Sequence, residues 1–151
     1  MPEAVPMVES ARIPIDERLL TSPLTVLEEV RLRGTRCLSC GEVFFGKYVS
    51  CENCGGADVQ EIRLGHRGTL YSYTVMRVRP SQNYKGPDPF VPYGVGLVEL
   101  PEGCCVMAPL SITEGLYVGM EMELVIETLY RNAEGHEVVA FKFKPADGGH
   151  R

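Results

Sequence analysis

The sequence predicts a mainly β protein in which a small metal-binding ribbon precedes a closed barrel. Two observations predict it. Two Cys-x-x-Cys pairs, each followed by glycine, are separated by ten residues, and five strand-like segments follow residue 66, with glycines at the bends and no long helix. Five short strands hide their edges most simply by closing into a small barrel. We therefore expect a rubredoxin-like zinc ribbon followed by a five-strand OB-fold barrel, with an N-terminal arm or short helix.

The ribbon is predicted from its cysteines, Cys37, Cys40, Cys51 and Cys54. Each pair can place two thiolates on one side of a tight turn, and the following glycine supplies the backbone freedom that the turn needs. Two facing turns make a tetrahedral four-sulfur site, which suits one structural Zn²⁺ per chain and leaves no open coordination position. The alternatives are two disulfides, a Cys-x-x-Cys redox centre, and iron in a rubredoxin-like electron carrier.

Composition and charge narrow the class of protein. The chain has 151 residues, and 15 basic against 20 acidic side chains give a net charge of −5, which argues against a general nucleic-acid binder. The sequence has no apolar run long enough to span a membrane, and no secretory signal is apparent at its start. With four cysteines in metal-ligand spacing, these features predict a reducing, cytoplasmic compartment.

The N-terminal region is expected to be an arm without a core of its own. Residues 1–21 hold three prolines and mixed charge without a clear period. Ser22 and Pro23 are typical of a helix start, with a short helix over 24–29. The alternation of apolar and basic residues over 30–33 predicts a strand that leads into the first cysteine pair.

The segment between the cysteine pairs is predicted to form a small hairpin over 42–49. Its aromatic residues Phe44 and Phe45 would cover the metal site, or alternatively contact a ligand. A ribbon of this size buries little apolar surface, so metal binding should supply most of its folding free energy.

The barrel strands are predicted from β-branched, aromatic and alternating residues, over 69–79, 93–100, 104–110, 121–127 and 137–144. The third of these is mostly apolar, so we expect it to be buried on both faces. Together with the ribbon, these strands predict four segments: an arm over 1–29, the ribbon over 30–66, the barrel over 67–146 and a tail over 147–151.

The proline-rich loop over 80–92 is the best candidate for contact with a ligand or a partner, because long loops are often functional. Candidate contacts for coenzyme A (CoA) or for a partner subunit are Arg67, Tyr84, Phe90 and Tyr93. The alternative is a surface loop whose aromatic residues pack on the barrel.

No catalytic residue is predicted in this chain. Cys104 and Cys105 are neighbours on one strand, so their side chains point to opposite faces, one toward the core and one outward. His66, His136 and His150 share no motif with a nucleophile. A closed four-cysteine site also leaves no position for an activated water.

The combination of motifs resembles the DUF35 family of zinc-ribbon and OB-fold proteins. The two cysteine pairs are followed by a Pro-Tyr-Gly-Val-Gly-Leu-Val-Glu-Leu-Pro-Glu-Gly segment over 92–103, by Tyr-Val-Gly-Met over 117–120 and by Phe-Lys-Phe-Lys-Pro over 141–145. The resemblance covers about residues 30–146. The arm over 1–29 departs from it, because it lacks the pair of helices usual in the family.

The resemblance implies a function that composition does not show. Members of this family are small subunits of acyl-CoA-processing complexes, and most partner thiolase-fold enzymes that supply the catalytic residues. We therefore expect a hetero-oligomer with a thiolase-like catalytic subunit, and acyl-CoA or CoA at or near the subunit interface. The alternatives are a nucleic-acid-binding ribbon and barrel, and the rubredoxin-like electron carrier; visible absorbance separates the latter from a zinc protein.

Overall fold

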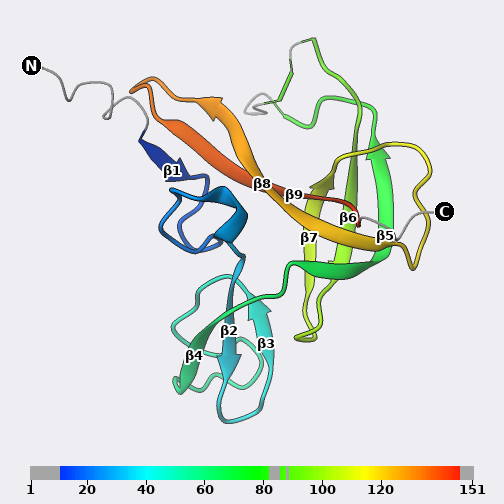
Figure 1. Cartoon of the computed structure of the whole chain (residues 1–151). Helices are drawn as coiled ribbons and strands as arrows, with labels where there is room; N and C mark the ends of the chain where they lie inside the picture. Colours follow the sequence, from blue (N-terminus) through cyan, green and yellow to red (C-terminus); the bar gives the residue numbers. More distant parts are fainter. Residues whose placement is uncertain (1–10, 82–85, 88, 147–151) are drawn as a thin grey trace, which may run out of the picture.

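The computed structural model describes residues 11–81, 86–87 and 89–146 (Figure 1). Residues 1–10 of the predicted arm, the candidate contact Tyr84, and the predicted tail with His150 lie outside the described residues. In the described part of the chain, no helix has the length and apolar character that a membrane crossing requires.

Five strands close into a barrel: β5 (Arg67–Met76), β6 (Tyr93–Glu99), β7 (Cys105–Leu110), β8 (Glu121–Arg131) and β9 (Glu137–Pro145). Strands β5, β6 and β7 form an antiparallel meander, and β8 pairs with both β5 and β9. A parallel pairing of Leu110 in β7 with Phe143 in β9 closes the ring. The predicted five-strand OB-fold barrel is therefore confirmed.

The barrel interior is filled by the alternate side chains that the pleat turns inward. Phe143, Leu70, Val98 and Met122 have no exposed surface. The two inward-facing glycines of β6 leave room for this core, because a Cβ on Gly96 would approach the Leu70 side chain to 2.7 Å.

The burial of strand β7 differs from what the sequence predicted. It was expected to be buried on both faces, but burial alternates along it: Val106, Ala108 and Leu110 are buried, whereas Cys105, Met107 and Pro109 are exposed. The inner face belongs to the barrel core, and no other layer among the described residues covers the outer face. A continuous apolar run is ambiguous here because it fits both a doubly covered strand and a half-exposed one.

The ribbon is a three-stranded antiparallel sheet in which β2 (Arg33–Cys37) lies between β3 (Val43–Phe45) and β4 (Val59–Arg63). The predicted strand over 30–33 was displaced, since β2 begins at Arg33 and Leu32 forms only an isolated bridge with Leu20. The predicted hairpin over 42–49 was also wrong, because β3 pairs with β2 and not with residues 46–49. Strand β4 was not predicted.

The arm adds a sixth strand to the barrel sheet. Strand β1 (Arg12–Pro14) runs parallel to β9, and the Arg12 side chain binds Glu137 at 3.2 Å. The predicted helix over 24–29 is only a 3₁₀ turn, η1 (Leu27–Glu29), and Ser22 does not cap it. The Arg12 guanidinium donates to the carbonyl oxygens of Leu24 and Thr25 at 2.9 and 3.0 Å, which ties the start of this segment to β1.

The ribbon and the barrel share one hydrophobic core. Leu32 and Leu64, which flank the ribbon strands, are fully buried in the same cluster as Leu70 of the barrel. The ring of Phe45 meets Phe141 of β9 edge-on, with centroids 5.7 Å apart. Phe45 therefore packs against the barrel and does not cover the cysteines.

Candidate metal centre

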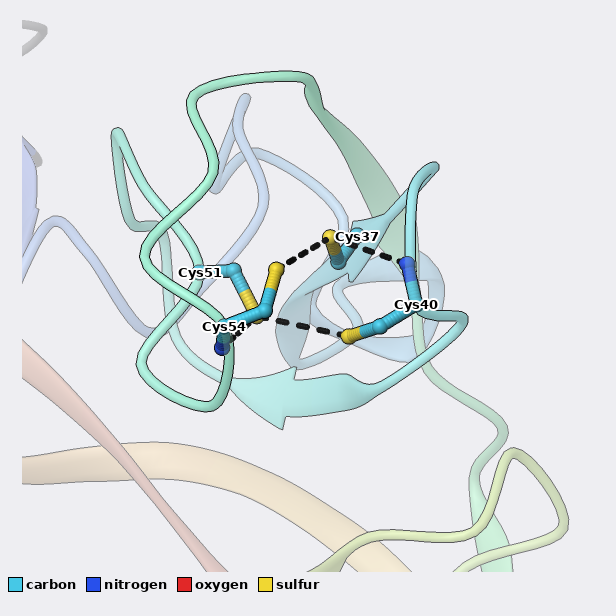
Figure 2. Close-up of side chains that lie close together, drawn as sticks. All are labelled: Cys37, Cys40, Cys51 and Cys54. Atoms are coloured by element: carbon cyan, nitrogen blue, oxygen red, sulfur yellow. Dashed lines mark hydrogen bonds between the residues drawn. The ribbon is translucent and has the colours of Figure 1, made fainter.

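Two equivalent turns present the four predicted cysteines to one another (Figure 2). In the first, the Gly41 amide donates to the Cys37 carbonyl at 2.9 Å, and in the second the Gly55 amide does the same to Cys51 at 2.9 Å. Both glycines have positive φ angles, 83° and 79°, which glycine adopts without the steric cost of a Cβ. The glycine after each cysteine pair is thus explained by the turn it closes.

The four sulfurs form one compact cluster. All lie within 4.8 Å of one another, with Cys37 and Cys54 3.7 Å apart and Cys40 and Cys51 3.6 Å apart. A disulfide requires sulfurs about 2.05 Å apart, and all six cysteines of the chain are free thiols. The four cysteines of the cluster are therefore not joined by disulfide bonds in this structure.

Backbone amides surround the two buried sulfurs. Cys40 N–H donates to Cys37 Sγ at 3.4 Å, and Cys51 Sγ accepts from the amides of Asn53 and Cys54 at 3.2 and 3.3 Å. The Asn53 side chain adds a donor 3.6 Å from the sulfur of Cys40. Asn53 was not among the site residues predicted from the sequence, although its position inside the second Cys-x-x-Cys motif could have indicated that it lies beside the sulfurs. Amide donors of this kind stabilise thiolates.

The thiols of the cluster differ in acidity. The Cys40 amide, helped by that of Ser39, lowers the pKa of Cys37 to about 6. The Gly56 amide also favours the Cys54 thiolate, but the Cys37 and Cys51 sulfurs and desolvation outweigh it and raise the pKa of Cys54 to about 11. Negative charges on neighbouring sulfurs repel each other, so the cluster cannot be fully ionised unless a cation neutralises it.

The donor set fits a structural Zn²⁺ ion. Four sulfurs placed tetrahedrally about 2.3 Å from zinc are roughly 3.8 Å apart, close to the two separations of 3.6 and 3.7 Å. Cys37 and Cys51 are buried, and Cys40 and Cys54 are exposed, so each turn contributes one inner and one outer sulfur. Four thiolates would complete the coordination of zinc and leave no site for substrate.

Arg67 lies apart from the other candidate contacts. It opens β5 next to three carboxylates, with its guanidinium 3.9 Å from Glu123, and it lines a surface hollow that also includes Glu99 and Glu121. Tyr93 pairs with Met76 at the other end of β5. Ten residues of strand separate these ends by roughly 30 Å, so the structure does not bring Arg67 and Tyr93 into one site.

Phe90 and Tyr93 lie together, with ring centroids 6.1 Å apart. Tyr93 lines a mostly apolar groove of about 510 Å³ between the β8–β9 hairpin, the end of β7 and the segment before β6, which we call the hairpin groove. Other apolar walls of the groove come from Ile15, Leu129 and Phe141. Figure 1 shows the hairpin that forms one wall projecting beyond the barrel. Sequence reasoning found Tyr93 but missed the groove, because its walls are far apart in the chain.

The other cysteines take the positions expected of neighbours on a strand. Cys104 is buried, and desolvation raises its pKa to about 11, whereas Cys105 is exposed. A raised pKa keeps the buried thiol protonated and unreactive near neutral pH. His66 lies where the ribbon joins the barrel, and its carbonyl accepts from Leu124 at 2.8 Å. His136 is in the turn between β8 and β9.

Comparison with protein families gives two adjoining matches. Residues 26–60 match the rubredoxin-like zinc ribbon domain of ChsH2, and residues 61–127 match its C-terminal OB-fold domain. The ribbon match and the four-cysteine cluster together identify a structural zinc site, with one cluster per chain.

Several known proteins are similar over most of the chain. A DUF35 domain-containing scaffold protein of Methanocaldococcus jannaschii is 29% identical over 136 residues, covering 87% of this chain and 94% of that protein. Benzoylsuccinyl-CoA thiolase subunit BbsA of Thauera aromatica is 32% identical over 115 residues, 75% of each chain. A solved chain of the Ltp2-ChsH2(DUF35) aldolase is 28% identical with a TM-score of 0.56, covering 76% of this chain and 84% of that chain.

Proposed function

The chain belongs to the DUF35 family of zinc-ribbon and OB-fold proteins, and we propose that it is a non-catalytic subunit of an acyl-CoA-processing complex. Its partner would be a thiolase-fold subunit that supplies the catalytic residues. The observation that carries this proposal is the similarity to BbsA, a thiolase subunit, over three quarters of both chains. The solved relative also belongs to a two-component enzyme, an aldolase named for Ltp2 and ChsH2.

The metal centre supports a structural role. Cys37, Cys40, Cys51 and Cys54 would all bind the zinc ion, which stabilises the fold of the ribbon and holds no substrate. Free thiols in such a site agree with a reducing, cytoplasmic compartment, which we include in the proposal. The segments would be the arm over 1–29, the ribbon over 30–66, the barrel over 67–146 and the tail over 147–151.

The acyl-CoA part of the proposal concerns the aromatic pair by the hairpin groove. Phe90 and Tyr93 would contact the partner or the pantetheine arm of CoA, because aromatic side chains provide large contact area at little entropic cost. Because Arg67 is far from Tyr93, it would contact a CoA phosphate only at a site separate from the aromatic pair. Its three acidic neighbours oppose an anion there.

Reconstitution tests the proposal. The zinc-loaded chain is co-expressed with each thiolase-fold protein of the same genome, and complexes are purified through a tag on the partner. We expect one partner to form a stable complex and to show thiolysis, condensation or carbon–carbon cleavage of an acyl-CoA. The chain alone should be inert toward the same thioesters, because a closed four-cysteine zinc site leaves no position for an activated water and the partner would supply the nucleophile and base.

A double variant, Phe90→Ala with Tyr93→Ala, tests the aromatic pair. It should weaken the complex or its CoA binding without releasing zinc, since both residues lie outside the ribbon. Val49→Ala is the control, because Val49 is 83% exposed on the ribbon, outside both Cys-x-x-Cys motifs, and does not line the groove. Robust acyl-CoA turnover by the chain alone, or the absence of any thiolase-fold partner, would overturn the proposal.

A further inference from the structure

The outer surface of β6 and β7 is apolar where a barrel in water normally carries polar side chains. Gly94, Gly96 and Val98 turn inward along β6, so Val95 and Leu97 turn outward. On β7, Met107 pairs with Leu97, and Pro109 pairs with Val95. Met107 is 65% exposed. We call these four residues, Val95, Leu97, Met107 and Pro109, the outer patch.

The outer patch continues without a break into the hairpin groove. Pro109 belongs to both, and Tyr93 follows Val95 outward on the same strand and also lines the groove. Beyond them the groove presents Ile15, 45% exposed, and Leu129, 40% exposed. Patch and groove together form one apolar surface that crosses the barrel and the projecting hairpin.

Among the residues that the structure describes, charge is nearly absent from this surface. The four residues of the outer patch are uncharged, and the charged side chains that line the groove, Glu127 and Lys142, neutralise each other at 3.0 Å. The largest contiguous apolar patch on a protein surface is often an interaction site. The centre of a protein interface is depleted of charge and enriched in methionine and aromatic residues.

The shape of the surface indicates what kind of partner fits. The outer patch lies on the outside of a closed barrel, so it is convex, and two copies placed patch to patch would touch over a small area. The hairpin groove is concave and, at about 510 Å³, has room for several apolar side chains. A convex patch beside a groove fits a partner with a shallow concavity and a projecting apolar loop or helix end.

We propose that the outer patch and the hairpin groove are the docking surface for the thiolase-fold catalytic subunit. This inference rests on the proposed function and adds which face of the chain the partner covers. The two strands of the outer patch, about 4.8 Å apart and six residues long, present roughly 200 Å² in projection, so patch and groove form the centre of an interface whose usual size is about 800 Å² per partner. Neighbouring residues would supply the polar rim.

The test introduces a single charge at the centre of the surface and at a matched control position. Met107→Lys places an ammonium group in the outer patch, and because the side chain is largely exposed, the barrel should tolerate it. Val49→Lys makes a comparable change on the ribbon, where Val49 is 83% exposed. Ile15→Lys repeats the test in the groove. Zinc content and circular dichroism of all three variants should match those of the wild type.

Binding of each zinc-loaded variant to the purified catalytic subunit is measured by calorimetry. We expect Met107→Lys to raise Kd about 100-fold, Ile15→Lys to raise it at least about tenfold, and Val49→Lys to leave it within threefold of the wild type. If the wild type binds and Met107→Lys binds equally well, this docking surface is wrong while the proposed function stands.

Two further outcomes overturn the inference in other ways. If the wild-type chain binds none of the thiolase-fold proteins, the proposed function fails and this inference fails with it. If the chain alone sediments as a dimer that Met107→Lys dissociates, a second copy covers the surface instead. The comparison of wild type with variant therefore separates failure of the surface from failure of the function.

Discussion

The ribbon and the barrel of this chain are stabilised in different ways. The barrel buries a continuous core that includes Leu70, Val98, Val106 and Phe143, all with no exposed surface. Between Arg33 and Arg63, the buried side chains are Thr35, Cys37 and Cys51, and two of these three belong to the metal cluster. Leu32 and Leu64, at the two ends of this stretch, belong to the core shared with the barrel. The ribbon therefore depends on its metal for folding, whereas burial of the barrel core drives the folding of the barrel.

Removal of zinc should therefore unfold the ribbon and leave the barrel folded. We expect this loss of stability to be the largest of the predicted effects. Structural zinc contributes about 10–16 kcal/mol in isolated zinc-finger peptides, far more than a ribbon core this small can replace. We expect Cys40→Ser to lose the zinc and to lose hydrogen-exchange protection across β2, β3 and β4, while β6 and β7 stay protected.

Cys105→Ser is the control for the zinc experiment, because Cys105 is an exposed thiol on the barrel, outside the cluster. It should retain one zinc per chain by elemental analysis. Undiminished zinc in Cys40→Ser would remove Cys40 from the site, and iron in the wild type would revive the electron-carrier alternative.

Truncation of a side chain in the barrel core should have the opposite effect: it should destabilise the barrel and leave zinc binding unchanged. Phe143→Ala removes a fully buried ring at the strand pairing that closes the barrel, and this should cost about 3–5 kcal/mol of unfolding free energy. Urea denaturation of the zinc-loaded protein measures it, with Met107→Ala as the exposed control, for which we expect less than about 1 kcal/mol. A loss of zinc from folded Phe143→Ala would show that the two regions are not independently stabilised.

The contact between Phe45 and Phe141 measures how strongly the regions are coupled. Each ring belongs to a different region, and their centroids are 5.7 Å apart. A double-mutant cycle with Phe45→Ala and Phe141→Ala should give a coupling energy of about 0.5–1.5 kcal/mol. Additive effects of the two substitutions would mean that the shared core, and not this ring pair, couples ribbon to barrel.

The ribbon and the barrel also differ in which of their features the sequence predicts. The four cysteines and their glycines were predictable because metal ligation and a positive φ each require a particular residue type at a fixed spacing. The five barrel strands were predictable from alternation and turn residues. Strand β4 was missed because Val59–Arg63 holds two charged residues and one glutamine, and its pairing with β2 is a tertiary effect.

The errors have physical causes in long-range contacts. In place of the expected helix over 24–29 there is a short 3₁₀ turn, and Arg12, more than ten residues away, binds the carbonyl groups of Leu24 and Thr25, a contact that no local pattern reveals. The outer face of β7 was predicted to be buried because an apolar strand in one sequence does not reveal which face lacks a second layer. The hairpin groove joins Ile15, Tyr93 and Leu129, which no local pattern connects.

The smallest predicted effect concerns the arm, whose strand β1 pairs with β9 of the barrel sheet. Hydrogen bonds hold the pKa of Glu137 below its ordinary value of 4.5, and the bond from the Thr128 hydroxyl contributes more than the bond from Arg12. A carboxyl whose folded pKa is depressed stabilises the protein above its unfolded pKa, and this stabilisation is lost as pH falls through the folded pKa. The wild type should therefore lose stability below about pH 4.5 more steeply than Glu137→Gln.

Thermal unfolding of both proteins between pH 3 and pH 6 measures this difference, since zinc loss at low pH affects the two alike. Parallel pH profiles would mean that the charge of Glu137 does not secure β1.

The most direct test of the account is native mass spectrometry of the chain co-expressed with its thiolase-fold partner. We expect a mass that contains both proteins and one zinc ion for each 16.7 kDa chain, and acyl-CoA turnover in that species alone. Separate masses of the two proteins under gentle conditions, or turnover in the fraction that holds only this chain, would contradict the account.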